Sequence, residues 1–175
     1  MSATLRGESW YAIYCISRHE RQVNERLNAK GISTFLAEAL MRVQWGSRIR
    51  KVNKNLLPGY VLVHAQMDPD TYLRALQTPS VVKFVGNPWP NLSWIPDEQV
   101  DSLRLLLGSG ETFSETPYWK SGDRVEVIAG PLMGLKGLVV TGESRRQRVI
   151  VSLDLLQRSL AVEVDSANLR ALRSP

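Results

Sequence analysis

The sequence predicts an α+β protein: an N-terminal α/β sandwich with a mainly antiparallel sheet, a flexible linker, and a small all-β barrel. Three observations support this prediction. Strand-like and helix-like patterns alternate through residues 1–107, a segment rich in Gly, Ser and Thr follows at 108–117, and short strand-like runs recur through 118–175. We therefore expect two domains joined by a linker.

The first domain opens with a strand, a helix and a second strand. Residues 9–17, SWYAIYCIS, are apolar throughout, which is typical of a central strand covered on both faces. The charged segment 18–31 places Val23 and Leu27 four positions apart and stops at Gly31, which indicates a helix with a narrow buried stripe and a glycine at its C-terminal end. Residues 33–38 favour the next strand.

A hairpin and a core strand come next. Residues 41–55 alternate about a Trp-Gly-Ser turn, which predicts a β-hairpin. Residues 56–66, LLPGYVLVHAQ, enter a buried strand through Pro-Gly.

The remaining elements of the first domain follow the same pattern. Residues 68–77 begin with Asp and Pro, a favourable helix start, and 80–86 return as a strand. Residues 95–108 carry Pro and acids in the first turn and a stripe of Val and Leu along one face, which predicts a helix.

The second domain is predicted to contain only strands. The short runs are separated by turn residues and lie at 124–129, 135–142, 148–155 and 160–165. The turn between the first two runs carries Gly130, Gly134 and Gly137, which suit positive φ or close approach of the backbone. This turn is no phosphate-binding loop, because Lys136 precedes its glycine, no Ser or Thr follows, and a strand continues where a helix is needed.

No residue pattern indicates catalysis. The two histidines, His19 and His64, do not belong to a cluster with metal-ligand spacing, and the carboxylates are scattered. Cys15 lies in an apolar run, which predicts a buried thiol and a reducing compartment. We expect no enzyme activity, cofactor or metal.

Composition and charge favour a cytoplasmic protein with an acidic partner. The chain has a formal charge of +5 and a pI near 9.6, with 43% hydrophobic and 22% charged residues. It carries neither a secretory signal pattern nor an apolar run long enough to cross a bilayer, so we expect no membrane association. Two mildly basic blocks flank the acidic segment 108–117.

Four motifs together resemble the NusG family of transcription elongation factors. WYAIYC near the N-terminus, LLPGYVLV in the middle strand and VVKFVG before the last helix are similar to the family's N-terminal domain. GDRVEVIAGPLMGLKGLVV resembles a KOW motif, and the order and spacing agree over residues 9–172. The resemblance implies an N-terminal domain at 1–107, a linker at 108–117 and a KOW domain at 118–175.

The resemblance also implies the partners. Proteins of this family bind the clamp of the largest subunit of RNA polymerase through apolar residues of the N-terminal domain and suppress pausing. The corresponding positions here are Tyr14, Leu57, Tyr60, Leu62 and Phe84. Few buried apolar residues usually dominate such an interface, although any of these could instead be core.

The family's KOW domain recruits a further partner such as the ribosome or Rho. The contact positions implied for it are Leu132 and Met133 at the loop tip, followed by Leu155, Leu156 and Arg158. We expect a monomer.

Basic residues predict a weak contact with DNA. They lie on the hairpin and the first helix, at Arg42, Arg48, Arg50, Lys51 and Lys54 and at Arg18, Arg21 and Arg26. Phosphate contacts would give affinity without sequence specificity. The alternative is a solvated hairpin edge, because cations also protect edges from aggregation.

The N-terminal motif and the compact first domain resemble specialised RfaH-, LoaP- or UpxY-like paralogues, which act as antiterminators on selected long operons. A different class of function also fits the KOW motif: an RNA- or ribosome-binding protein without a role in transcription.

Overall fold

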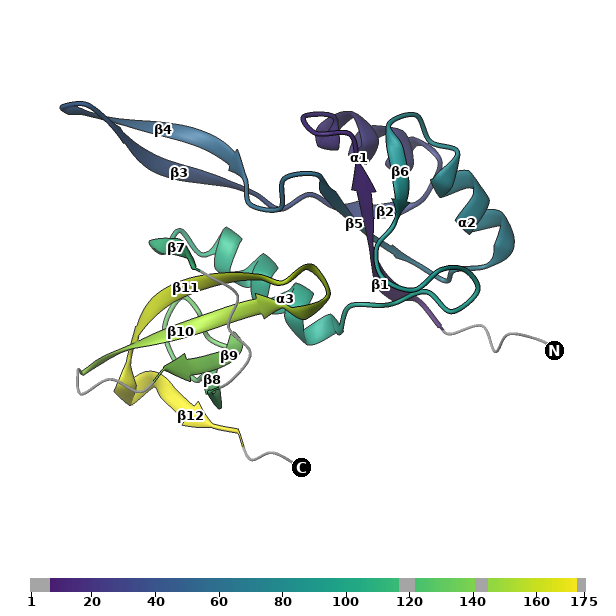
Figure 1. Ribbon diagram of the computed structural model, residues 1–175. Coiled ribbons are helices and arrows are strands. Elements are labelled where there is room, and N and C mark those ends of the chain that lie inside the picture. The colour runs from purple at the N-terminus through teal and green to yellow at the C-terminus, as the bar shows by residue number, and fades with distance from the viewer. Residues whose placement is uncertain (1–6, 117–121, 141–144, 173–175) are drawn as a thin grey trace. The chain divides into compact units, whose positions relative to one another are not determined.

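The computed structural model describes residues 7–116, 122–140 and 145–172, apart from the side chains of Arg42 and Val43. The chain forms two compact units, residues 1–95 and 96–175 (Figure 1). Each unit is built on antiparallel strands, which the sequence predicted for the first unit.

The first unit contains a four-stranded sheet with the order β2-β5-β1-β6, in which every pairing is antiparallel. Its elements are β1 (Ser9–Cys15), α1 (Glu20–Ala29), β2 (Ser33–Phe35), β5 (Tyr60–Ala65), α2 (Pro69–Leu76) and β6 (Val81–Phe84). The central strands β1 and β5 are those that the sequence marks as most apolar, because central strands bury both faces.

Both helices pack on one face of this sheet. Alternate residues of β1 and β5 point to that face and form a core with the apolar stripes of the helices. Its fully buried members include Ile13, Val23, Leu27, Val61 and Val63. The helix stripe predicted from the sequence is therefore confirmed.

Helix α1 ends in a Schellman motif. Gly31 has φ +75°, its amide donates to the Asn28 carbonyl at 2.9 Å, and the Ile32 amide donates to the Leu27 carbonyl at 3.0 Å. Only glycine adopts this φ without strain, and Ile32 is 2% exposed, so it anchors the exit of the chain in the core.

Helix α2 begins at an aspartate cap. Asp68 accepts a hydrogen bond from the Thr71 amide at 2.7 Å, and Pro69 occupies the first turn. The bond to the Thr71 amide, with smaller help from Arg74, lowers the pKa of Asp68 below its ordinary value of 3.8.

This cap predicts a pH dependence of stability. Because the folded-state pKa is lowered, the carboxylate stabilises the fold fully above the ordinary pKa of 3.8, and this contribution is lost as the pH falls through the lower folded pKa. Acid unfolding of the wild type and of Asp68→Asn, followed by circular dichroism, tests this. The amide of Asn retains an acceptor but cannot titrate, so the variant should lose less stability at low pH. Equal losses would contradict the assignment.

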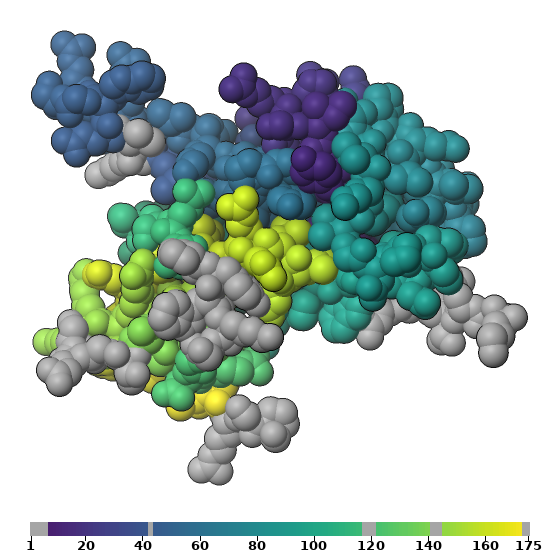
Figure 2. All heavy atoms as spheres, viewed as in Figure 1, coloured from purple at the N-terminus to yellow at the C-terminus, as the bar shows by residue number. Residues whose placement is uncertain are grey.

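The hairpin forms a separate two-stranded sheet of β3 (Glu38–Trp45) and β4 (Arg48–Asn55). Its strands pair from Glu38 with Asn55 to Trp45 with Arg48, and Gly46, with φ +62°, lies in the turn. The far end of the hairpin projects from the rest of its own unit (Figures 1 and 2).

The second unit contains α3 (Asp97–Gly108) and a six-stranded antiparallel sheet with the order β12-β8-β9-β10-β11-β7. The strands are β7 (Phe113–Thr116), β8 (Asp123–Val127), β9 (Lys136–Val140), β10 (Arg146–Leu153), β11 (Arg158–Asp165) and β12 (Leu169–Ala171). Two single turns of 3₁₀-helix, η1 (Asp154–Leu156) and η2 (Ser166–Asn168), follow β10 and β11.

Helix α3 packs on β9 and β10 of this sheet. The Ser102 hydroxyl accepts from the Lys136 amide at 3.0 Å, and the Gln99 side chain exchanges two hydrogen bonds with Asp154. Glu98 forms ion pairs with Arg124 and Lys136. These contacts place α3 in the second compact unit.

The segment 108–117 contains a strand where the sequence predicted only a linker. Within it, β7 pairs with β11, from Phe113 opposite Val162 to Thr116 opposite Ser159. The backbone N–H and C=O groups along the edge of β11 form hydrogen bonds with the backbone of β7, and this pairing does not depend on the side chains of β7. The Gly, Ser and Thr content of the segment therefore did not indicate a strand.

Candidate functional site

The Leu-Pro-Gly turn before β5 holds the first part of the candidate site. Gly59 has φ +85°, its carbonyl accepts from the Cys15 amide at 2.8 Å, and its amide donates to Glu20 Oε1 at 2.7 Å. Glu20 is 8% exposed, so this carboxylate is a buried acceptor that fixes the turn. The turn thereby aligns Tyr60 opposite Tyr14.

The two tyrosines lie on the sheet face opposite the helices, which we call the second sheet face. It is defined by Trp10, Ala12 and Tyr14 of β1 and by Tyr60, Leu62 and His64 of β5, which alternate with the helix-side core residues. The Tyr14 and Tyr60 rings are 5.6 Å apart, and the Trp10 ring contacts those of Phe35 and His64. The face is therefore mainly aromatic and apolar, and within it Trp10, Ala12 and Leu62 are buried while the Tyr14–Tyr60 end is accessible.

The structure brings together some of the five positions that the sequence assigned to polymerase binding. Tyr14 is 38% exposed and Tyr60 is half-buried, while Leu57 and Leu62 are buried. Phe84 does not lie with them. It pairs with Ile13, belongs to the helix-side core, and stacks on Tyr72 at 5.1 Å, because its position in β6 alternates onto that side.

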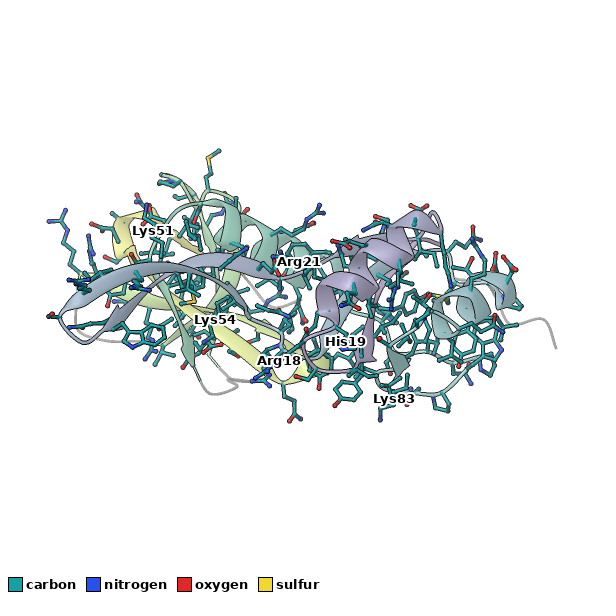
Figure 3. All side chains as sticks on the ribbon, turned by 90° about the horizontal axis from the view of Figure 1, so that it is seen from above. Arg18, His19, Arg21, Lys51, Lys54 and Lys83 are labelled. Carbon is teal, nitrogen blue, oxygen red and sulfur yellow. The ribbon has the colours of Figure 1, made fainter. Side chains whose placement is uncertain are left out.

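A basic cluster surrounds the start of α1 (Figure 3). Arg18 is exposed, His19 Nδ1 lies 2.8 Å from Ser80 Oγ, and Lys83 of β6 is exposed. Arg18 and Ser80 have φ of +67° and +74°. Non-glycine residues in this region cost about 1–3 kcal/mol each and often mark functional sites.

Two of the predicted cations of this cluster are engaged within the fold. Arg21 forms an ion pair with Glu38 at 2.9 Å, and Arg26 donates to the Pro79 carbonyl at 3.1 Å. The sequence did not identify His19, Ser80 or Lys83, because only the pairing of β6 with β1 brings residues 80–84 beside the start of α1.

The hairpin supplies the other cations. Arg48, Arg50 and Lys51 are exposed and Lys54 is half-buried, whereas the side chain of Arg42 lies outside the described residues. Trp45 beside the turn is 71% exposed and lies under the Arg50 guanidinium. Trp45 was not among the predicted site residues, because its exposure follows from the register of the hairpin.

A family described as "Transcription termination factor nusG" matches residues 8–104. This chain belongs to the NusG family. The transcription termination/antitermination protein NusG of Pseudomonas aeruginosa is 28% identical over 91% of this chain and 96% of its own length. The protein of the same name from Staphylococcus carnosus is 28% identical over 94% of this chain and 96% of its own length. A structure titled "Domain interaction in Thermotoga maritima NusG" covers 95% of this chain and 98% of its own, at 24% identity and TM-score 0.49.

The second unit of this NusG-family chain holds the residues that the sequence assigned to a KOW partner. Met133 is 65% exposed, Arg158 is exposed and Leu155 is half-buried. Leu132 and Leu156 are buried, so Leu132 does not form an exposed tip with Met133. The turn is tight, because the Gly134 amide donates to the Val127 carbonyl at 2.8 Å, and it directs neighbouring side chains to opposite sides.

The described residues of this NusG-family chain include no group of three or more His, Cys, Asp or Glu side chains that could hold a metal ion. Burial, and secondarily Glu20, raises the pKa of the Cys15 thiol to about 11, so it is a poor nucleophile. Among the helices in the described part of the chain, none has the length and apolar character needed to span a membrane.

Proposed function

We propose that this NusG-family chain is a transcription elongation and antitermination factor that binds RNA polymerase through the accessible Tyr14–Tyr60 end of the second sheet face. The observation that supports this most directly is the Tyr14–Tyr60 pair, held at 5.6 Å on an apolar face by the buried Glu20–Gly59 bond. Rigid, partly accessible aromatic side chains are typical anchors of protein interfaces. The names of the relatives from Pseudomonas aeruginosa and Staphylococcus carnosus support the same role.

The proposal assigns three contacts. The Tyr14–Tyr60 end of the second sheet face takes the clamp of the largest polymerase subunit. The basic residues around the start of α1 and on the hairpin contact nucleic acid held by the polymerase. The second unit, as a KOW domain, recruits a further partner such as the ribosome or Rho through Met133, Leu155 and Arg158. Family membership and the N-terminal motif are consistent with a specialised paralogue that acts on selected operons.

Co-purification of the full chain with RNA polymerase tests the proposal. Tyr14→Ala with Tyr60→Ala should weaken binding at least about 30-fold, because central aromatic anchors contribute about 2 kcal/mol or more. Leu73→Ala is a matched control, since Leu73 is 50% exposed on α2, away from the second sheet face. Circular dichroism checks that each variant folds, and Tyr14→Phe should retain binding.

Two outcomes would contradict the proposal. If the double variant folds and binds polymerase as tightly as the wild type, Tyr14 and Tyr60 do not form the polymerase contact. A wild-type chain that binds ribosomes or RNA and does not associate with polymerase would favour an RNA- or ribosome-binding KOW protein without a role in transcription.

A further inference from the structure

Strand β7 is the outermost strand of the sheet in the second unit and is held by few side chains (Figure 1). In the described sheets it pairs only with β11, from Phe113 opposite Val162 to Thr116 opposite Ser159. Phe113, its one large apolar residue, is half-buried, and Ser114 is exposed. Strands with so few buried apolar contacts open locally at a low cost in free energy. β7 can therefore leave the sheet without unfolding the unit.

Strand β11 does not depend on β7 for its place. Its other edge pairs with β10 along its whole length. Leu160 and Val162 are 6% and 2% exposed, and Val162 lies opposite the fully buried Val149 of β10. If β7 leaves, β11 should stay in the sheet, and the backbone N–H and C=O groups along residues 159–162 would be open to another extended chain.

The connection before β7 allows the strand to swing away. Helix α3 ends at Gly108, so residues 109–112 join it to β7. Gly110, with φ +76°, lies in this connection, and glycine has the widest backbone freedom. Helix α3 makes its own contacts with the sheet through Ser102 and Gln99. Release of β7 therefore leaves α3 in place.

The edge that β7 covers continues the surface proposed for the KOW partner. β11 begins at Arg158, which belongs to that surface with Met133 and Leu155. The next residue, Ser159, is already paired with Thr116 of β7. A protein that contacts Arg158 therefore lies at one end of the row of backbone groups that β7 occupies.

We propose that β7 is a removable strand that closes the edge of β11, and that an extended polypeptide segment of the KOW partner takes its place. The partner contact rests on the proposed function, whereas the competition for the edge can be tested without the partner. The sheet specifies an apolar residue opposite Val162, where Phe113 lies. It specifies a small or polar residue opposite Ala161, where Ser114 lies. Backbone hydrogen bonds supply the affinity of such a strand, and these side-chain positions supply its selectivity.

Hydrogen exchange of the full chain, followed by NMR, tests whether β7 is removable. Phe113→Ala should speed the exchange of the β11 amides that face β7 about 10-fold or more, because truncating a half-buried phenylalanine costs roughly half of what a fully buried one does. The amides between β10 and β9 should exchange at the wild-type rate. Ser114→Ala is the matched control on the same strand, since Ser114 is exposed, and it should exchange like the wild type.

A fluorescent peptide with the sequence of residues 110–116, GETFSET, is the probe for the open edge. Measured by anisotropy, it should bind the Phe113→Ala chain about 10-fold more tightly than the wild type, because the fraction of chains with an open edge rises by that factor. A peptide with alanine in place of the phenylalanine should bind neither protein. The bound peptide should also slow exchange at residues 159–162 of Phe113→Ala.

The inference is overturned if the peptide binds the wild type and Phe113→Ala equally, or binds neither of them. It is also overturned if Phe113→Ala speeds exchange throughout β10, because β7 would then be an integral part of the sheet. These assays contain no polymerase, ribosome or Rho, so they can fail while the proposed function holds. A chain that captures the peptide as expected but does not co-purify with polymerase would contradict the proposed function alone.

Discussion

Gly137→Ala should destabilise the second unit by about 2–3 kcal/mol, because a Cβ at this position overlaps backbone that cannot move aside. The added atom would lie 2.4 Å from the Ile150 carbonyl oxygen and 3.0 Å from a Val149 methyl group. Its φ lies outside the left-handed region, so the effect is steric and not conformational. Relief requires β9 to separate from β10, which weakens the pairing of Leu138 with Ile150.

Differential scanning calorimetry of the full chain measures this effect. For a unit of this size the expected loss corresponds to a decrease of roughly 10–20 °C in its transition temperature. Gly108→Ala is the matched control, since a Cβ there meets no atom within 4 Å and the residue ends a helix, where alanine is favourable. Equal transition temperatures for the two variants would show that the β9–β10 contact is looser than described.

Glu20→Ala should destabilise the first unit by about 1–3 kcal/mol, because it leaves the buried Gly59 amide without an acceptor. Glu20→Gln should have a smaller effect, since its amide oxygen can still accept. The Pro58–Gly59 turn would also be released, and with it the alignment of Tyr14 and Tyr60. Polymerase binding should therefore weaken in Glu20→Ala even under conditions where the variant stays folded.

Urea unfolding of the wild type, Glu20→Ala and Glu20→Gln gives their free energies of unfolding. Glu25→Ala serves as the control, because Glu25 is an exposed carboxylate on the same helix. If Glu20→Ala and Glu25→Ala had the same small effect, the Glu20–Gly59 bond would not determine the turn.

Local signals were sufficient to predict most of the fold. Gly31 marked the end of α1, Asp68 and Pro69 marked the start of α2, and the Trp-Gly-Ser turn located the hairpin. Each of these residues determines the backbone conformation only of its close neighbours in the sequence, so its effect can be predicted without knowing the tertiary structure. The strands β7 and β12 were not predicted. Their residues show no strand-like pattern, and they form strands because they pair with β11 and β8, which are distant in the sequence.

The sequence supplied candidate residue types for the site, but not the burial and neighbours of those residues. Tyr14 and Tyr60 were candidates because of the resemblance to the family, and the hairpin cations because of their charge. The burial of Leu57, the helix-side place of Phe84 and the His19–Ser80 contact depend on which faces and loops the sheet brings together. Trp45 was missed because an exposed aromatic residue cannot be told from a core one until the register of the hairpin is known.

The isolated pairing of β3 with β4 also bears on how the molecule opens. In the described sheets these two strands pair only with each other, and every residue from Arg48 to Asn53 is exposed. Few core contacts oppose fraying there, so the hairpin can unzip from its turn toward Glu38 while the four-stranded sheet stays intact. Its amide hydrogens should exchange with solvent through local opening, far faster than those of β1, and nucleic acid bound to the hairpin would slow that exchange at the hairpin alone.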